Sequence, residues 1–349
     1  MNVSVSQALK LCKDNNHIIL DVRTAPECAQ GIAKGAVCLE LTDIEEQATT
    51  KLSKLNSYYV MCQAGPRSVM AIEKLTQLGF EKLFQIELGY QAWKHEKLPI
   101  EIPEIDNNDL RYQRHHQLKG FGKQAQNKLL GAHVLLIGAG GLGSSSALYL
   151  AAAGVGQISI VDDDIVQLSN LQRQIIHNTK SIGNLKVDSA KKHISALNPE
   201  IQINAIDSKL DHNNATNLIK GVDVVIDGSD NLSTRYLVND VCHSLSIPLV
   251  YAAVYQYEAQ LSVFDFKISN TPCLRCLFPQ TDGFEPANCS TEGVLGVVPG
   301  LAGIMQASEA IKLITDVGEV LTGKLFIMDL MDNSTRIIKY SKSENCQNH

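Results

Sequence analysis

Short apolar runs and amphipathic stretches alternate along residues 1–100. The runs HIILDV at 17–22 and YYVMC at 58–62 are rich in residues that favour strands, so we expect buried strands there. Between and after them lie stretches such as RSVMAIEKLTQLGF at 67–80, in which apolar residues recur at helical spacing. This alternation predicts a small α/β domain at the start of the chain.

A linker and a second domain follow. The segment LPIEIPEIDNND at 98–109 has two prolines, several acidic residues and no sustained period, which is typical of a linker. Beyond it, HVLLIG at 133–138 predicts a buried strand, SSSALYLAAAG at 144–154 a helix of small residues, and ISIVDDD at 158–164 a second strand. VDVVIDGSD and IPLVYAAV repeat the pattern later, which predicts a doubly wound, parallel, Rossmann-like sheet. We therefore expect domains at residues 1–103 and 104–349.

Composition narrows the classes of partner. A chain of 349 residues is long enough for two ordinary domains, and 44% apolar with 19% charged residues is typical of a globular protein. The net charge of −6 provides no field for a polyanion, so we expect no nucleic acid partner. The N-terminus lacks a signal peptide pattern, and no apolar run approaches the roughly 18 residues of a membrane span. We expect a cytoplasmic protein that uses no membrane.

The cysteines point to thiol chemistry or metal binding. Their number is nine, an odd count in a long chain without a secretory signal, which argues against a disulfide framework. Four of them have no partner at ligand spacing and are interpreted as packing residues, namely Cys12, Cys28, Cys38 and Cys242.

A glycine-rich loop follows the first strand of the second domain. Its glycines let the backbone approach a phosphate, and the helix that begins there offers unpaired N–H groups. Asp162 lies 19 residues beyond Gly143, at the end of the next strand, where a carboxylate accepts hydrogen bonds from a ribose. The loop glycines are Gly138, Gly140, Gly141 and Gly143. This pattern alone predicts a nucleotide site for NAD as readily as for ATP.

Further polar residues favour ATP. The segments VDDDIVQLSNLQRQ, GNLKV and VIDGSDN supply Asn170, Arg173, Lys186 and Asp230 at strand ends or in loops. Two cations and an extra carboxylate suit a triphosphate with Mg²⁺ better than a dinucleotide. Asp227 is the alternative to Asp230 as the carboxylate that faces the metal.

Residues 111–332 resemble the MoeB/ThiF/HesA family, relatives of ubiquitin-activating enzymes. The resemblance rests on RYQRHHQLKGFG, GAGGLGSSSALYLAAAGVG, LSNLQRQ, DGSDN, PCLRCLFP and STEGVLGVVPG, which occur in the family's order. It implies that ATP is the substrate, that the partner is a small ubiquitin-like sulfur carrier ending in Gly-Gly, and that the enzyme is a homodimer.

The resemblance also implies roles for single residues. Asp162 binds the ribose and Asp230 the magnesium. Arg114, in the RYQR segment, reaches into the partner subunit's site. The triphosphate is bound by three polar residues, Asn170, Arg173 and Lys186.

Cys273-Leu-Arg-Cys276 predicts half of a zinc site, because tetrahedral zinc needs two more ligands. In the family, a second pair near the C-terminus usually completes it, and here that place holds Cys346-Gln-Asn-His349. We expect zinc bound by three cysteines and one histidine. The alternatives are that the chain end frays or that Cys273 and Cys276 form a redox pair.

Cys289 lies in ANCSTEGVLG, a stretch that in the resembling family carries a cysteine able to bond to the carrier or its sulfur. The alternative is a tolerated surface thiol.

Residues 1–100 resemble a single rhodanese domain. Cys62 follows a strand and precedes a helix, where N–H groups and the helix dipole favour a thiolate or persulfide. Asp21-Val-Arg23 and ELGYQAW at 87–93 complete the resemblance. Four residues separate Cys62 from Arg67, whereas the related phosphatases have one more, so the spacing indicates sulfur chemistry. Arg67 is expected to orient the loop or hold an anionic sulfur donor.

Together these features predict an ATP-dependent adenylyltransferase that activates the carrier's terminal carboxylate. A persulfide on Cys62 then gives the thiocarboxylate, and a persulfide donor such as a cysteine desulfurase supplies the sulfur. The sequence leaves the pathway open between molybdopterin synthesis, thiamine-thiazole synthesis and another thiolation. The alternatives are a non-catalytic scaffold that binds the carrier and an NAD-dependent oxidoreductase.

Overall fold

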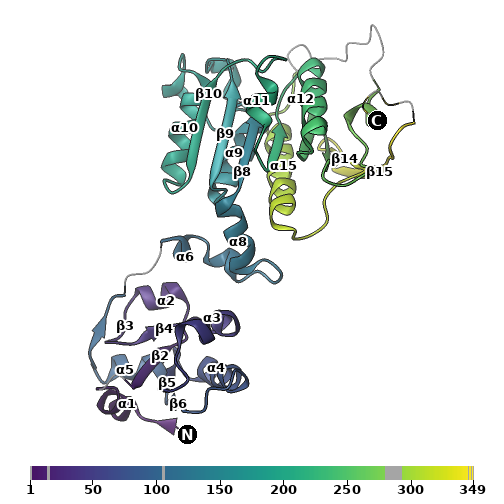
Figure 1. Ribbon diagram of the computed structural model, residues 1–349. Helices are drawn as coiled ribbons and strands as arrows, with labels where there is room; N and C mark the ends of the chain where they lie inside the picture. Colours follow the sequence, from purple (N-terminus) through teal and green to yellow (C-terminus); the bar gives the residue numbers. More distant parts are fainter. Residues whose placement is uncertain are drawn as a thin grey trace. The chain divides into compact units, whose positions relative to one another are not determined.

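The computed structural model describes residues 2–13, 16–103, 107–279, 293–344, 346 and 348. The chain forms two compact units, Met1–Gln117 and Leu118–His349, each with its own core (Figure 1). The domain boundary predicted between residues 103 and 104 stays a prediction. Cys289 and His349 lie outside the described residues.

A parallel sheet with the strand order β1-β6-β5-β2-β4 forms the centre of the first unit. Its strands are β1 (Asn2–Val3), β2 (His17–Asp21), β4 (Val37–Cys38), β5 (Ser57–Met61) and β6 (Leu83–Ile86). The helices of this unit are α1 (Val5–Leu11), α2 (Ala25–Ala29), η1 (Leu41–Asp43), α3 (Ile44–Lys51), α4 (Pro66–Gln77), α5 (Gly89–His95), α6 (Asn107–Arg111) and α7 (Gln113–His116). A small antiparallel ribbon pairs β3 (Ile32–Ala33) with β7 (Ile100–Glu101).

Successive residues of a strand place their side chains on opposite faces of this sheet. Leu20 and Val60 pack with Leu75 of α4, whereas Ile19 and Tyr59 pack with Trp93 of α5. A strand buried on both sides needs apolar residues at every position, which explains the continuous runs HIILDV and YYVMC. The predicted α/β domain is confirmed.

The sheet of the second unit has the strand order β10-β9-β8-β11-β12-β13-β14-β15. The strands from β10 to β12 are parallel and the rest antiparallel. Their bounds are β8 (His133–Ile137), β9 (Gln157–Asp162), β10 (Gln202–Asp207), β11 (Val224–Asp227), β12 (Leu249–Tyr255), β13 (Glu258–Phe264), β14 (Lys324–Asp329) and β15 (Ser334–Lys339).

The predicted parallel, doubly wound sheet is confirmed, but the antiparallel extension was not predicted. It begins at a two-residue turn in which Gln256 adopts a φ of +46°. This turn lies between β12 and β13, and its sequence, Tyr255-Gln-Tyr-Glu258, lacks the asparagine or glycine that normally marks a tight hairpin.

Helices cover both faces of this sheet. On one face, α9 (Gly141–Ala153), α10 (Lys186–Leu197) and α15 (Val297–Thr315) pack on residues such as Val134. On the other, α11 (Ala215–Ile219) and α12 (Leu232–Leu245) pack on residues such as Leu135. The remaining helices are α8 (Gly122–Gly131), η2 (Leu168–Asn170), η3 (Thr179–Ser181) and α13 (Leu274–Leu277).

The chain reverses its winding direction between β8 and β11. From β8 the chain runs outward through β9 to β10 (Figure 1). It then returns, and β11 pairs with β8 on the side opposite β9. In such sheets a crevice opens at the carboxyl ends of the two strands where the direction changes. The glycine loop follows β8 and the DGSDN segment follows β11, so both border this crevice.

Helix α15 is long and apolar enough to cross a membrane by length and composition alone. The expectation that no segment reaches this threshold was therefore too strict. Its packing against α9, β12 and β13 accounts for its apolar composition, because a helix in the core of a protein can be as long and as apolar as a membrane span.

Gln306 of α15 is fully buried and its amide joins the helix to two strands. Nε2 donates to the carbonyl oxygens of Asp227, at 2.7 Å, and Val250, at 3.2 Å. We predict that Gln306→Leu lowers the free energy of unfolding of this unit by about 1–3 kcal/mol, because two buried carbonyls lose a donor. Urea denaturation measures the change. Gln167→Leu, at an exposed position, serves as the control, and an equal loss there would contradict the prediction.

Candidate functional site

The loop after β8 packs so closely that side chains are excluded from it. Gly138 has a φ of +92°, which favours glycine, and a Cβ on Gly143 would lie 2.0 Å from the carbonyl oxygen of Gly138. The helix α9 can therefore start directly beneath the loop. Gly141 and Leu142, the first residues of α9, line the crevice, and a helix start offers unpaired N–H groups that suit a phosphate.

A cleft lies at this crevice, and most of the residues predicted to bind the nucleotide line it. Gly138, Gly140 and Gly141 form part of its wall. The predicted polar residues in the lining are Asp162, Arg173, Lys186 and Asp230. Gly143 and Asn170 are not in the lining. Gly143 acts through packing, and the carbonyl oxygen of Asn170 accepts hydrogen bonds from Arg173 N and Gln174 N.

Asp162 and Lys186 form a largely buried pair at the end of β9. Oδ2 of Asp162 accepts a hydrogen bond from Ala139 N at 2.8 Å, so the carboxylate is fixed to the glycine loop. Nζ of Lys186 lies 2.7 Å from Oδ2 of Asp164 and 3.9 Å from Oδ1 of Asp162. Burial raises the pKa of Asp162, although the Lys186 charge and two N–H groups oppose the shift. These contacts fix the Asp162 carboxylate and the Lys186 ammonium group at the cleft wall.

Asp227 and Asp230 differ sharply in exposure. Asp227 is fully buried; Ser229 donates to its Oδ1 from both N and Oγ, while its Oδ2 has no partner among the described residues. Desolvation raises the pKa of Asp227. Asp230 is exposed and lines the cleft, so the geometry favours Asp230 as the carboxylate that meets a ligand.

Arg235 also lines the cleft, and the sequence analysis missed it. Its guanidinium lies 5.3 Å from the ring centre of Tyr251, and Nη2 donates to the Ser229 carbonyl at 2.8 Å. Arg235 lies in the first turn of α12, five positions after Asp230, and its place in the helix that follows the DGSDN loop was the signal available. Arg114, in contrast, is exposed on α7 in the first unit, and its predicted role stays a prediction.

Cys62 lies at the start of the loop that joins β5 to α4. The residue is almost fully buried, and its Sγ accepts a hydrogen bond from Gly65 N at 3.1 Å. Burial opposes ionisation, but N–H groups of Ala64, Gly65 and Ser68 and the Ser68 hydroxyl outweigh it and lower the pKa of Cys62. The loop is therefore built to hold a sulfur anion.

The ELGYQAW segment packs against the backbone of this loop. Gly89 has a φ of +53°, and a Cβ there would lie 2.0 Å from the Cys62 carbonyl oxygen. The same carbonyl accepts a hydrogen bond from Tyr90 N at 2.8 Å. The predicted motif thus fixes the backbone of the cysteine itself.

Arg67 is held by Glu27, a residue that the sequence analysis did not single out. Nη1 and Nη2 of Arg67 donate to the two carboxylate oxygens, each at 2.7 Å. This hydrogen bonding lowers the pKa of Glu27 to about 2. The available signal was the capping pattern Thr24-x-x-Glu27.

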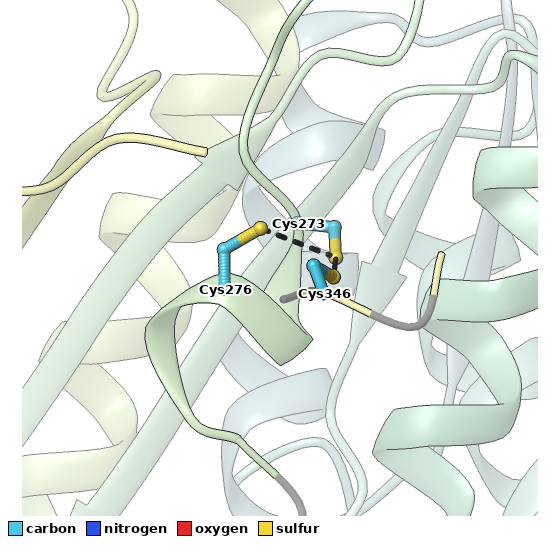
Figure 2. Close-up of side chains that lie close together, drawn as sticks. All are labelled: Cys273, Cys276 and Cys346. Carbon is cyan, nitrogen blue, oxygen red and sulfur yellow. Dashed lines mark hydrogen bonds between the residues drawn. The ribbon is translucent and has the colours of Figure 1, made fainter. Parts of the chain in front are cut away.

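Three predicted zinc ligands lie together in the second unit (Figure 2). The Sγ atom of Cys273 is 3.9 Å from that of Cys276 and 3.5 Å from that of Cys346. Burial is the main cause that raises the pKa of Cys273 to about 12. Asn348 donates to Asp240 at 2.7 Å, and Arg275 pairs with the same carboxylate. The described residues of the tail are therefore anchored, not frayed.

The lowered pKa of Cys62 leads to a test by alkylation. We predict that the rate of iodoacetamide attack on Cys62 rises with pH and reaches half its maximum below the ordinary cysteine pKa. Ser68→Ala should move this midpoint to higher pH, because the thiolate loses a hydrogen-bond donor. Mass spectrometry of the Cys62 peptide measures the rate. Thr76→Ala, on the exposed part of the same helix, should leave the midpoint in place; an unmoved midpoint in Ser68→Ala would contradict the prediction.

Comparison with known proteins places this geometry in a family. The ThiF family model matches residues 112–348 and the rhodanese-like domain model residues 4–96. The chain is 43% identical over 252 residues to the SAMP-activating enzyme E1 of Haloferax volcanii, covering 71% of this chain and 90% of that protein. It is 44% identical over 240 residues to the adenylyltransferase and sulfurtransferase MOCS3 of Culex quinquefasciatus, covering 68% of this chain.

The chain spans about half of the MOCS3 relative, since the match covers 54% of that protein. Among solved structures, E. coli MccB with MccA-N7isoASN has the same fold. Its TM-score is 0.62 at 22% identity, and the match covers 74% of this chain and 79% of that one. The resemblance and the fold class expected from the sequence are confirmed. The chain belongs to the ThiF family and carries a rhodanese-like domain at residues 4–96.

Proposed function

We propose that the chain is an ATP-dependent adenylyltransferase for the C-terminal Gly-Gly carboxylate of a small ubiquitin-like sulfur carrier. Its rhodanese-like domain is the sulfurtransferase that provides the sulfur. The observation that carries the proposal is the cleft at the β8–β11 crevice, whose wall combines the glycine loop with Arg173, Lys186 and Asp230. The names of the relatives support it, because one is an adenylyltransferase and sulfurtransferase and another is a SAMP-activating enzyme.

The chemistry explains why cations, not a general base, line the cleft. A carboxylate is already ionised at pH 7, so its attack on the α-phosphorus needs alignment and neutralised charge. ATP is the nucleotide in this family of enzymes, and we assign Asp162 to the ribose and Asp230 to Mg²⁺. Arg173 and Lys186 balance the phosphate charge, while pyrophosphate leaves and an acyl-adenylate forms.

Sulfur transfer follows at the activated carbonyl. The persulfide on Cys62 attacks the acyl carbon, either directly or by way of Cys289, and AMP is displaced. In the direct route the product is an acyl disulfide, carrier–C(O)–S–S–Cys62. A thiolate, either Cys289 or an external thiol reductant, then attacks the Cys62 sulfur; the S–S bond breaks, the carrier thiocarboxylate leaves with the electron pair, and a thiol reductant reduces the new disulfide at Cys62. Because both units belong to one chain, the persulfide stays at a high effective concentration near the adenylate.

Partners and assembly follow from the same proposal. A persulfide donor such as a cysteine desulfurase loads Cys62, and the enzyme works as a cytoplasmic homodimer in which Arg114 reaches the partner's site. Exposed apolar side chains in the segment 165–182 support an interface. They are Ile165, Leu168, Ile175 and Ile182.

The decisive test is ATP–pyrophosphate exchange with candidate Gly-Gly carriers. We predict exchange with one carrier and a loss of about 100-fold or more in Asp230→Asn, because the metal-facing charge is removed. Asp188→Asn, an exposed carboxylate on α10 outside this cleft, should keep the exchange. Binding of a carrier without exchange would instead favour a scaffold, and reduction of a nicotinamide would favour an oxidoreductase.

We further propose a structural zinc ion at Cys273, Cys276 and Cys346, with His349 as the fourth ligand. Tetrahedral zinc with Zn–S bonds of about 2.3 Å separates its sulfurs by about 3.8 Å. The observed separations of 3.9 Å and 3.5 Å fit this geometry. Zinc would tie the C-terminal tail to α13.

Elemental analysis tests this site. We predict about one zinc per chain, lost in Cys346→Ser because the remaining ligands bind zinc weakly. Cys12→Ser, in the first unit, is the matched control and should retain the metal. A zinc-free protein, or full zinc in Cys346→Ser, would refute the site and favour a redox pair.

A further inference from the structure

The cation at the Cys62 loop is already bound by a carboxylate of the protein. Arg67 uses one N–H from each terminal nitrogen for Glu27, at 2.7 Å on both sides. Glu27 is itself held, since Thr24 donates to Oε2 from N at 3.0 Å and from Oγ1 at 2.8 Å. A planar, two-point contact with a prearranged carboxylate is the strong form of an ion pair.

The second arginine of this region, Arg23, is even less available to bind an anionic sulfur donor. Arg23 is buried, with Nη2 2.7 Å from Oδ2 of Asp21 and 2.8 Å from the Gly31 carbonyl oxygen. Its guanidinium lies 3.5 Å from the centre of the Tyr90 ring. Every side of this group is occupied by the protein.

Each of the two arginines near Cys62 is therefore neutralised by a carboxylate, Arg67 by Glu27 and Arg23 by Asp21. The sulfur anion is stabilised by backbone N–H groups, which suit a single charge located at Sγ. Thiosulfate brings two negative charges and needs a further cation at the loop rim. An organic persulfide brings at most one negative charge. After the transfer, this single charge takes the place of the thiolate charge on Sγ, where the backbone N–H groups stabilise it.

We propose that Glu27 is a positioning residue that sets the donor specificity of the Cys62 loop. By holding Arg67, it makes the loop take sulfur from the persulfide of a protein or a small thiol in preference to thiosulfate. This inference rests on the proposed sulfurtransferase function and assigns the residue that makes the loop prefer the persulfide donor proposed there.

The transfer balances without an added oxidant or reductant. The Cys62 thiolate attacks the outer sulfur of R–S–SH, a new S–S bond forms, and the old S–S bond breaks. The thiol R–S⁻ leaves with the electron pair, and the proton stays on the outer sulfur, which gives Cys62–S–SH. Donor and acceptor exchange one sulfur atom at the same oxidation level.

The test compares two donors in the full chain. Mass spectrometry follows the gain of one sulfur at Cys62 in single-turnover reactions with thiosulfate or glutathione persulfide, over a range of concentrations. In Glu27→Gln, the second-order rate constant for Cys62 loading by thiosulfate, divided by that for the persulfide, should rise about fivefold, because a partly exposed ion pair is released. The change should come from a lower half-saturating thiosulfate concentration, and it should shrink at high salt.

Glu45→Gln is the matched control. It removes the same charge from the same unit, at the Glu45–Lys74 pair between α3 and α4, and should leave the donor ratio within about twofold of the parent. An unchanged ratio in Glu27→Gln, or an equal rise in Glu45→Gln, would overturn the inference while sulfur loading itself stands. An equal loss with both donors would assign Glu27 a purely structural role and also overturn it. A parent chain that accepts sulfur from neither donor would sink the sulfurtransferase function as well.

Discussion

The second unit depends on backbone segments that touch without side chains between them. At the β8–β11 crevice, Gly143 lies against the Gly138 carbonyl, and a Cβ on Gly138 would approach the Gly228 carbonyl to 3.1 Å. These contacts bring the loop after β8, the start of α9 and the end of β11 to one place. The cleft exists because strand ends, a helix start and their polar residues converge there, and each of these would separate if the glycines carried side chains.

Both units offer a site suited to an anion by the same physical means, but the side chains around the two sites differ. In each, a strand ends in a loop whose N–H groups face the reactive position at the start of a helix. In the rhodanese-like domain the neighbouring arginines are paired with carboxylates. In the second unit, Arg173 and Arg235 line an open cleft, and neither forms an ion pair with a carboxylate among the described residues, although the charge of Arg235 acts on the buried Asp227. The first arrangement suits one small charge, and the second suits a polyphosphate.

Local patterns were predictable from the sequence, whereas contacts between distant segments were not. The glycine loop, Asp162 and the Cys62 loop each lie in a contiguous strand–loop–helix segment, so spacing alone located them. Glu27 is 40 positions from Arg67, and nothing in the spacing of the two indicates that they touch. The hairpin at Gln256 was missed because its turn lacks the usual residues. Cys346 was anticipated only through a family resemblance, since its partner lies 73 positions away.

Helix α15 links the architecture to the behaviour of the chain before it has folded. It packs on strands and a helix that precede it in the sequence, and its apolar composition matches that of a membrane segment. Until the sheet has formed, this surface has no place to bury, and a partly folded chain presents it to other molecules. Substitutions that slow assembly of the sheet would thus reduce the amount of soluble protein in a cell, even where the cleft and the Cys62 loop are untouched.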